Sequence, residues 1–283
     1  MEKVIINGKT VKSGLISIDD RGFTLGDGLF ETIPLYKGKP FLLAEHFDRL
    51  KLSAKKISLQ LPIEKKDLES SVDLLAKSNG IHRGVARLTV TRGKSTFGYS
   101  FINSVNPAWT LTVRPYKVMG KEKRVHGFTL KPVPLRKHPS SPVHNLKTIS
   151  SLDKIMALNQ AQRFNCDEAL SLTTEGYISS GAAVNIFWVR NGRLETPDSS
   201  CAILPGVTRK IAIDLSNNNC MEVLEGCFNL ETLKEAEEIF VTNSLLELVP
   251  VRKINGIFDC SGSNNITTKL QTLYRHTIET SLA

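Results

Sequence analysis

Alternating apolar and polar residues predict several short strands in the first third of the chain. Val4-Ile5-Ile6 and Thr10-Val11 flank Asn7-Gly8, a dipeptide that accepts the positive φ values of a tight hairpin turn. Between Val85 and Thr91 every second residue is apolar, as expected of a strand with one buried face. Further β-type segments are expected at 29–36, 40–43 and 109–113.

Apolar residues spaced three and four apart predict helices between these strands. One helix is expected over 45–59, where the apolar face consists of Phe47, Leu50, Ala54 and Ile57. A second follows Pro62, with Leu68, Val72, Leu75 and Ala76 on its apolar face. Strands and helices together predict an N-terminal α+β domain over residues 1–116.

Prolines and charges interrupt the pattern between Pro115 and Pro142, where an extended, irregular segment is expected. A linker is placed at 117–123 and a second α+β domain at 124–283. Within this domain the pattern predicts a helix over 148–163, a helix that opens at Pro205 with Val207, Ile211 and Leu215 facing inward, and a final helix around 266–273. Strands are expected at 168–173, 183–190, 193–196 and 238–242.

Composition is that of an ordinary globular protein, with 283 residues, 41% hydrophobic and 23% charged, which fits one large or two medium domains. No run approaches the ~20 apolar residues that span a bilayer, and no apolar secretion signal is visible, so a cytoplasmic protein without a membrane partner is expected. Five scattered cysteines without a CxxC pair predict reduced thiols and no metal site.

The formal net charge of +9 raises the possibility of nucleic-acid binding. Between Lys117 and Lys137, seven Lys or Arg residues stand against one Glu, so most of the excess lies in this one run. No zinc-finger, RRM or helix-turn-helix pattern surrounds it. A solvated basic surface, or a rim that attracts anionic substrates, is therefore preferred over a nucleic-acid partner.

Three segments have the residue types of an anion site. Gly206, Val207 and Thr208 open a helix, where free N–H groups and the helix dipole favour a phosphate. Thr242-Asn243-Ser244 follows a strand directly and offers hydroxyl and amide donors, and Arg49 projects from an amphipathic helix. Taken singly, such features are more often an ordinary helix cap or a solvated charge.

Lys147 follows the proline-rich stretch and precedes the helix expected from Thr148. A lysine in a partly dry site beside cationic or phosphate groups can lose its proton near neutral pH and form a Schiff base. The alternative is an ordinary surface lysine at a helix start.

The chain resembles the class IV aminotransferase family over nearly its whole length. These pyridoxal-phosphate enzymes include D-amino-acid and branched-chain aminotransferases and 4-amino-4-deoxychorismate lyase. The motifs that carry the resemblance are Asp19-Asp20-Arg21-Gly22-Phe23, Gly26-Asp27-Gly28-Leu29-Phe30-Glu31-Thr32, Glu45-His46-Phe47-Asp48-Arg49-Leu50, Thr91-Arg92-Gly93, Leu146-Lys147-Thr148, Asp167-Glu168-Ala169-Leu170, Asn185-Ile186-Phe187, Pro205-Gly206-Val207-Thr208-Arg209, Thr242-Asn243-Ser244 and Val249-Pro250-Val251.

The resemblance implies a two-domain α+β fold of the D-amino-acid-aminotransferase type, with pyridoxal 5′-phosphate in the interdomain cleft and usually a homodimer. Lys147 matches the lysine that binds the cofactor and moves the substrate proton. The residues implied to contact the cofactor are Arg49, Gly206, Val207, Thr208 and Ser244, with Asn243 as a neighbour.

One position departs from the family. The family normally has a glutamate that holds a proton on the pyridine nitrogen, and this chain has Ser180 there. A hydroxyl can only hydrogen bond to that nitrogen, so a weaker electron sink is implied. Glu175 is near in sequence but lies on the wrong side of Gly176 to be a simple substitute.

The loop 92–100 bears on the substrate. It lacks the Arg and His with which D-amino-acid aminotransferases hold a carboxylate, and it ends in Gly98-Tyr99-Ser100, as in the lyases, although Phe97 replaces their Arg. Phe30, Arg87 and Tyr99 are expected to contact the substrate. The resemblance favours a 4-amino-4-deoxychorismate lyase that releases pyruvate and the folate precursor 4-aminobenzoate, because aromatisation makes a weak electron sink tolerable. An aminotransferase of D-amino-acid or branched-chain type and a non-catalytic relative remain the alternatives.

Overall fold

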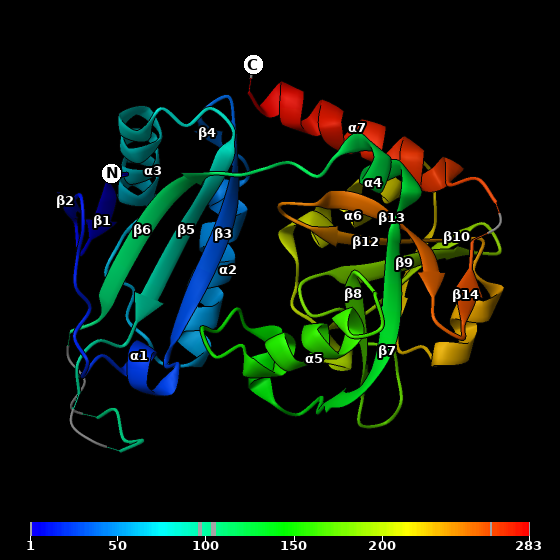
Figure 1. Ribbon diagram of the computed structural model, residues 1–283, viewed down its shortest axis with the longest axis horizontal. Coiled ribbons are helices and arrows are strands. Elements are labelled where there is room, and N and C mark those ends of the chain that lie inside the picture. Colours follow the sequence, from blue (N-terminus) through cyan, green and yellow to red (C-terminus); the bar gives the residue numbers. More distant parts are fainter. Residues whose placement is uncertain (1, 96–97, 103–105, 261, 283) are drawn as a thin grey trace. The chain divides into compact units, whose positions relative to one another are not determined.

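The computed structural model describes residues 2–95, 98–102, 106–260 and 262–282, and the chain forms two compact units (Figure 1). Unit 1 comprises Met1–Lys117, Leu146–Ser150 and Ser281–Ala283, and unit 2 comprises Val118–Asn145 and Ser151–Thr280. Lys147 therefore belongs to unit 1, whereas its place after the expected linker put it in the second domain. The reason is that residues 146–150 hydrogen bond to the first sheet.

Unit 1 contains a six-stranded antiparallel sheet (blue to green in Figure 1). Its strands are β1 (Val4–Ile6), β2 (Lys9–Val11), β3 (Gly28–Tyr36), β4 (Lys39–Pro40), β5 (Gly84–Thr91) and β6 (Ala108–Pro115), in the order β2-β1-β6-β5-β3-β4. The β1–β2 hairpin is confirmed, with φ values of +47° at Asn7 and +80° at Gly8. The strand expected over 40–43 is shorter because the chain enters a helix at Leu43.

Helices α2 (Leu43–Lys56) and α3 (Lys65–Asn79) pack on one face of this sheet, and a short α1 (Arg21–Leu25) precedes β3. The alternation predicted for β5 is confirmed, because Ala86, Leu88 and Val90 are buried in the core. The apolar faces predicted for both helices are confirmed as well, with Phe47, Leu50, Val72 and Leu75 buried against those strands. This packing fixes β3, which carries Phe30 and Glu31.

Unit 2 contains a mixed sheet of eight strands. They are β7 (Phe128–Lys137), β8 (Glu168–Thr173), β9 (Asn185–Arg190), β10 (Arg193–Pro197), β11 (Val223–Gly226), β12 (Glu238–Asn243), β13 (Glu247–Ile254) and β14 (Phe258–Asp259). The order is β11-β10-β9-β12-β13-β7-β8, and β14 pairs with β13. β7 lies parallel to both of its neighbours, and β10 and β11 are also parallel.

The region 115–142 is not the irregular segment that its prolines predict. It contains α4 (Lys121–His126), which begins inside the expected linker, and the ten-residue strand β7. Proline normally disrupts a central strand because it lacks an N–H donor. Here the register with β8 shifts between Pro132 and Arg136, so the prolines lie where the ladder is already irregular.

Three longer helices pack in unit 2: α5 (Leu152–Gln162), α6 (Val207–Asn217) and α7 (Asn265–Ser281). α6 buries Thr208, Ala212 and Ser216, whereas Ile211 and Leu215, which were expected to face inward, are half-buried. Small residues four apart let the helix approach β12 closely. Single-turn helices occur at η1 (Pro142–Asn145), η2 (Ser199–Cys201) and η3 (Leu230–Glu235). Within the described residues, no helix combines the length and apolar character that crossing a bilayer requires.

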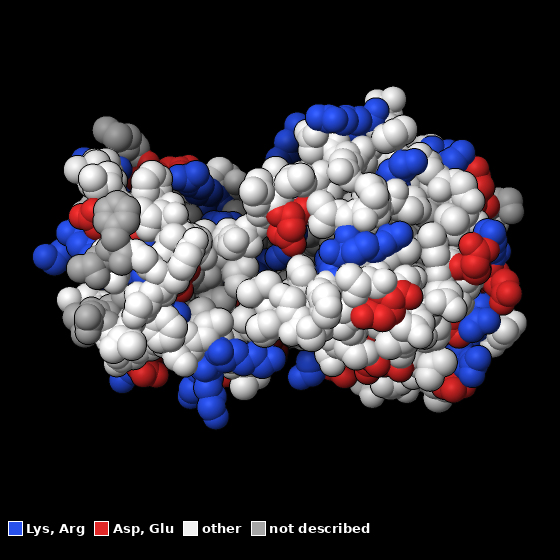
Figure 2. Space-filling model, turned by 90° about the horizontal axis from the view of Figure 1, so that it is seen from below, with Lys and Arg blue, Asp and Glu red and all other residues white. Residues whose placement is uncertain are grey.

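The basic run between 117 and 137, expected to be a solvated basic surface or a rim that attracts anionic substrates, is solvated only in part. Lys123 Nζ lies 2.6 Å from Asp167 Oδ1, Arg124 Nη1 lies 3.2 Å from Glu247 Oε2, and Lys137 is buried at the end of β7. On the face of unit 2 seen in Figure 2, Lys and Arg side chains are mixed with Asp and Glu side chains. Three of the seven basic residues of the run are therefore neutralised by local ion pairs or turned inward, and Lys117, Lys121 and Arg136 stay exposed.

Candidate active site

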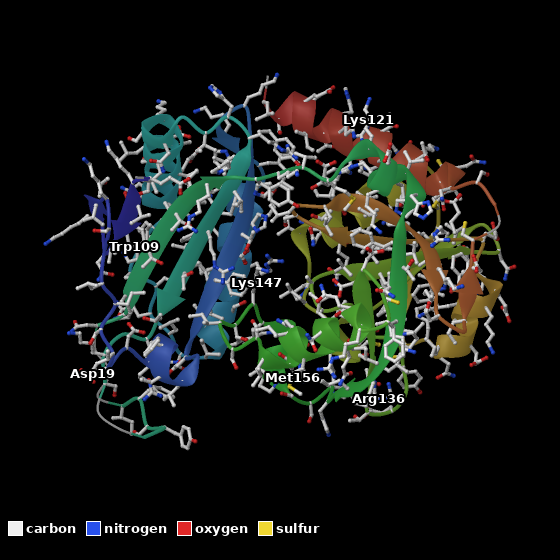
Figure 3. All side chains as sticks on the ribbon, in the orientation of Figure 1. Asp19, Trp109, Lys121, Arg136, Lys147 and Met156 are labelled. Carbon is white, nitrogen blue, oxygen red and sulfur yellow. The ribbon has the colours of Figure 1, made fainter. Side chains whose placement is uncertain are left out.

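Lys147 lies on an extended segment that adds to the edge of β3. The Phe30 amide donates to the Lys147 carbonyl (2.9 Å), the Ile149 amide donates to the Gly28 carbonyl (3.0 Å), and Leu29 and Thr148 form an antiparallel bridge. The helix that was expected to start at Thr148 begins only at Leu152. Strand pairing, rather than a helix N-terminus, therefore fixes the backbone of Lys147, whose half-buried side chain is labelled in Figure 3.

Two cationic side chains approach the same aromatic ring. Lys147 Nζ lies 4.4 Å and Arg87 Cζ 3.9 Å from the centroid of the Phe30 ring. Arg87 pairs with Thr32 in the β3–β5 register, so it lies on the face of the sheet that carries Phe30. Partial burial lowers the pKa of Arg87. The structure thus brings together Lys147, Phe30 and Arg87, and their charge favours an anionic molecule on this face.

The opposite face of β3 holds a buried charge cluster that sequence reasoning missed. Glu31, which is 1% exposed, accepts hydrogen bonds from Arg49 Nε (2.8 Å) and Arg49 Nη2 (2.6 Å) and lies 2.8 Å from His46 Nδ1. Burial opposes ionisation, but Arg49 and His46 outweigh it and lower the pKa of Glu31 to about 2. Glu31 therefore orients Arg49, which was expected to contact a phosphate.

The pKa of His46 in this cluster lies below its ordinary value. Burial lowers its pKa first, and the Glu31 carboxylate opposes that shift, while the charges of Arg49 and Lys147 lower the pKa further. Lys147 is therefore close enough to influence the cluster electrostatically. A charged residue on the apolar face of β3, and His and Arg three residues apart on α2, were the sequence signals for this cluster.

Tyr99, predicted to contact the substrate, has a side chain that is 86% exposed. Its described contact is through the backbone, where its carbonyl accepts a hydrogen bond from Arg21 Nη2 (3.1 Å). Phe97, on which part of the lyase resemblance rests, lies outside the described residues. The structure therefore does not place Tyr99 with Phe30 and Arg87.

In unit 2, the turn that opens α6 is packed tightly against β9. A Cβ atom at Gly206 would lie 2.2 Å from Asn185 Oδ1, so the turn requires glycine there. Asn185 Nδ2 donates to the Leu204 carbonyl (2.9 Å) and so holds the loop that leads into the turn. The first N–H groups of α6 have no partners within the helix and remain as donors at its N-terminus.

Among the described residues, two threonine hydroxyls near this turn have no hydrogen-bond partner. Thr208, 2% exposed, and Thr242, 1% exposed, each have a buried Oγ1 with no hydrogen-bond partner in the part of the chain that the structure describes. Thr242 pairs with Asn185 between β12 and β9, and Asn185 borders Gly206. Buried hydroxyls are rarely left unsatisfied without a reason. Hydroxyl donors beside a helix N-terminus fit a phosphate ester, such as that of pyridoxal phosphate.

Asn243 ends β12, and Ser244 directly follows it. Asn243 Oδ1 accepts hydrogen bonds from the amides of Leu245 (2.9 Å) and Leu246 (2.7 Å), and its Nδ2 donates to the Ala183 carbonyl (3.1 Å). These bonds shape the turn between β12 and β13. The Asn243 side chain is thus occupied by structural contacts, and Ser244 is half-buried.

Ser180, which stands where the family has a carboxylate, contacts a buried lysine. Lys137 Nζ donates to Ser180 Oγ (2.6 Å), and Ser180 Oγ donates to the Gly181 carbonyl (3.1 Å). Burial and the charge of Lys154 lower the pKa of Lys137 to about 8, although Asp153 and Glu168 oppose the shift. The position therefore has a hydroxyl and an ammonium, a charge opposite to the carboxylate of the family.

Two acidic residues, Glu175 and Glu168, lie near Ser180 in the sequence or in space, but their contacts do not let either one replace the carboxylate that the family has at this position. Glu175 is exposed and accepts a hydrogen bond from Thr174 Oγ1 (2.9 Å). Glu168 is buried, but its oxygens accept hydrogen bonds from the amides of Ala169, Ala182 and Ala183 at 2.8–3.2 Å. Glu168 therefore holds the 180–185 turn in place.

Comparison with known proteins identifies the class. The family model for amino-transferase class IV matches residues 28–254, so the chain belongs to this family. A putative branched-chain-amino-acid aminotransferase of Methanocaldococcus jannaschii is 33% identical over 96% of this chain and 95% of its own length. Aminodeoxychorismate lyase of Bacillus subtilis is 31% identical over 98% and 94%. D-alanine aminotransferase of Listeria monocytogenes is 32% identical over 95% and 93%.

Solved structures confirm the expected two-domain α+β fold. Branched-chain amino acid aminotransferase of Escherichia coli superposes with a TM-score of 0.91 at 25% identity, over 97% of this chain and 94% of the other. A putative 4-amino-4-deoxychorismate lyase from Legionella pneumophila gives 0.87 at 26% identity, over 94% and 96%. The chain is thus an enzyme of the pyridoxal-phosphate-dependent class IV family, and pyridoxal 5′-phosphate is its cofactor.

Proposed function

We propose that the chain is a 4-amino-4-deoxychorismate lyase that releases pyruvate and 4-aminobenzoate. The observation that carries the proposal is the Lys137–Ser180 contact. The Lys137 ammonium held by Ser180 would disfavour a positive charge on the ring nitrogen, so the Ser180 hydroxyl, which donates to the Gly181 carbonyl in this structure, would turn to donate to an unprotonated nitrogen. Such a site withdraws electrons weakly. It suits a reaction in which loss of pyruvate creates an aromatic ring, because aromatisation supplies driving force.

Lys147 is the proposed catalytic residue. Bound pyridoxal phosphate supplies a conjugated ring that delocalises negative charge. In this proposal the Lys147 amine would hold the cofactor covalently and would accept and return the substrate proton. Phe30 shields the amine on one side, and Arg87 orients a substrate carboxylate through charge-assisted hydrogen bonds.

The proposed phosphate contacts are the N–H groups of Val207 and Thr208 with the hydroxyls of Thr208, Thr242 and Ser244. Gly206 allows the turn to pack closely, and Arg49 adds a positive charge whose direction Glu31 fixes. A phosphate would satisfy the buried hydroxyls of Thr208 and Thr242, which have no partner among the described residues.

Thr208→Val provides a test of this set. Valine keeps the shape of threonine but removes the hydroxyl, so we expect cofactor affinity to fall about 10-fold or more. Without cofactor the variant should be as stable as the parent or more stable, because a buried unsatisfied hydroxyl is lost. Affinity is measured by equilibrium titration and stability by thermal unfolding.

Ser216→Ala is the matched control, because Ser216 is buried on the same helix and its Oγ donates to the Ala212 carbonyl (2.8 Å). It should leave cofactor affinity unchanged. If Thr208→Val lowered the thermal stability of the cofactor-free protein and left the cofactor affinity unchanged, Thr208 would have only a structural role.

Lys137→Met tests the Ser180 position. Lys137 has a pKa of about 8 and is surrounded by Lys154, Asp153, Glu168 and, further along the chain, His144. We expect the visible spectrum of the cofactor-loaded protein to change near pH 8, as the ammonium loses its proton. Burial of the Lys137 ammonium lowers the free energy of unfolding below about pH 8. This destabilisation disappears as pH rises from about 8 to 10.5, because the folded protein then carries the neutral amine. The spectral change near pH 8 should be absent in Lys137→Met and present in the control Lys131→Met.

The function itself is tested by mixing the purified, cofactor-loaded protein with 4-amino-4-deoxychorismate. A lyase produces 4-aminobenzoate and pyruvate in equal amounts without an amino acceptor. An aminotransferase instead transfers the amino group of D-alanine or L-valine to 2-oxoglutarate. Amino transfer without 4-aminobenzoate would replace the lyase proposal, and bound cofactor without either activity would indicate a non-catalytic relative.

A further inference from the structure

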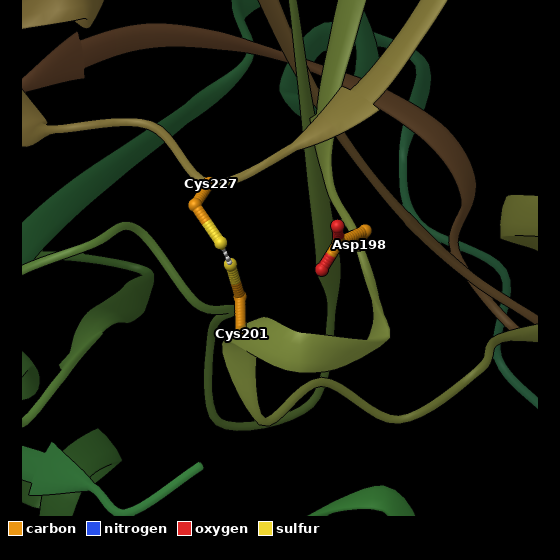
Figure 4. A group of neighbouring side chains, drawn as sticks. All are labelled: Asp198, Cys201 and Cys227. Carbon is orange, nitrogen blue, oxygen red and sulfur yellow. Dashed lines mark hydrogen bonds between the residues drawn. The ribbon is translucent and has the colours of Figure 1, made fainter.

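Two cysteines in unit 2 lie in direct contact. Cys201 Sγ and Cys227 Sγ are 3.3 Å apart, and the Asp198 carboxylate lies in the same cluster (Figure 4). Cys201 is 0% exposed, whereas Cys227 is exposed. Ser200 Oγ also contacts Cys227 Sγ at 3.2 Å. The catalytic scheme proposed above uses neither thiol.

Backbone pairing brings these cysteines together. Pro197 at the end of β10 is in register with Gly226 at the end of β11, and the Asp198 amide donates to the Gly226 carbonyl (3.2 Å). η2 then turns Cys201 back toward Cys227, which directly follows β11. The 3.3 Å between the two sulfurs must close to the ~2.05 Å of a sulfur–sulfur bond for a disulfide to form.

We propose that Cys201 and Cys227 are a thiol–disulfide exchange site. The two cysteines form an intramolecular disulfide by exchange with a small disulfide of the glutathione type. The Cys227 thiolate attacks one sulfur of glutathione disulfide, and one glutathione thiolate leaves. The Cys201 thiolate then attacks the Cys227 sulfur of the mixed disulfide and releases the second glutathione. The two thiol protons go to the two departing thiolates, so the protein pair is oxidised by two electrons and glutathione disulfide is reduced.

Burial sets the order of these steps. Cys227 is exposed and meets the small disulfide first, whereas Cys201 is enclosed. Burial, together with Cys227 and Asp198, raises the pKa of Cys201, so Cys201 reacts after its exposed neighbour rather than directly with a disulfide from solvent.

The disulfide would close a loop that contains the whole of α6 and the 206–208 turn. Cross-linking this loop limits the freedom of the unfolded chain, so the oxidised protein should unfold at a higher temperature by a few degrees. On the proposed function above, the bond would also restrain the loop that leads to the phosphate turn.

The experiment incubates the full chain, without substrate, in glutathione and glutathione disulfide mixtures, followed by alkylation and peptide mass analysis. We expect a peptide that links Cys201 to Cys227, a higher Tm, and reversal of both by dithiothreitol. Cys227→Ser should abolish both effects, while Cys220→Ser, which changes an exposed cysteine elsewhere, should retain them. The readouts do not depend on turnover, so a failed lyase assay leaves them intact.

Three outcomes would overturn the proposal. These are full alkylation of both cysteines under oxidising conditions, glutathione on Cys227 without a link to Cys201, and a link from Cys227 to another cysteine. Zn²⁺ added alone provides a further arm, because Asp198 and the two sulfurs offer ligand atoms within 4.8 Å of one another. Stoichiometric Zn²⁺ retention that protects both thiols from glutathione disulfide would identify a metal site in place of an exchange site.

Discussion

Replacing Lys147 by alanine is expected to abolish covalent attachment of the cofactor and to lower turnover by at least about 10³-fold. The amine has two proposed roles, as the covalent anchor and as the group that moves the substrate proton, and no other described lysine approaches Phe30. Turnover is measured with saturating pyridoxal phosphate, so that weaker binding does not hide the effect. Attachment is measured by borohydride reduction and peptide mass analysis.

Lys131→Ala is the matched control for this variant. Lys131 is also a half-buried lysine above an aromatic ring, with Nζ 4.3 Å from the Phe164 centroid. It belongs to the basic run and not to the candidate site, so turnover and attachment should be unchanged. Reduction that fixes the cofactor to a different lysine in the parent protein would contradict the assignment of Lys147.

Local sequence patterns correctly predicted those helices and strands whose buried faces are defined by residues only a few positions apart. Alternation in β5 and the apolar faces of α2 and α3 arise from residues a few positions apart, and the structure confirms them. β7 was missed because its prolines are normally incompatible with a central strand, and only the register shift against β8 accommodates them. The pairing of residues 147–149 with β3 links positions more than a hundred residues apart, and no local periodicity encodes it.

The same distinction applies to the candidate site. Residue type and resemblance singled out Lys147, Thr208 and Ser180, because these side chains belong to recognisable motifs. Their partners are long-range neighbours: Lys137 contacts Ser180 across 43 positions, and Glu31 contacts Arg49 across 18. A sequence alone gives the separation of such residues along the chain but not their distance in space. The charge contacts of the site could therefore not be predicted without the folded structure.

Glu31→Ala is expected to destabilise unit 1 by about 3–5 kcal/mol, because it leaves the Arg49 charge buried without its main partner. The free energy of unfolding is measured with urea and Trp109 fluorescence in a Trp188→Phe background, since the chain has two tryptophans and Trp109 is the one in unit 1. The control is Asp73→Ala, which removes the exposed Lys39–Asp73 pair (2.9 Å) and should cost at most about 1 kcal/mol.

The pH dependence and a double variant separate charge from packing. Because the pKa of Glu31 falls from 4.5 to about 2 on folding, its contribution is complete above pH 4.5 and is lost as pH falls from about 4.5 to 2. The parent should therefore lose stability over this range, and Glu31→Ala should lose less. Combining Glu31→Leu with Arg49→Met removes both charges and should recover most of the loss. If the double variant were as unstable as Glu31→Ala, the cluster would act through shape, and Glu31 would not be the group that orients Arg49.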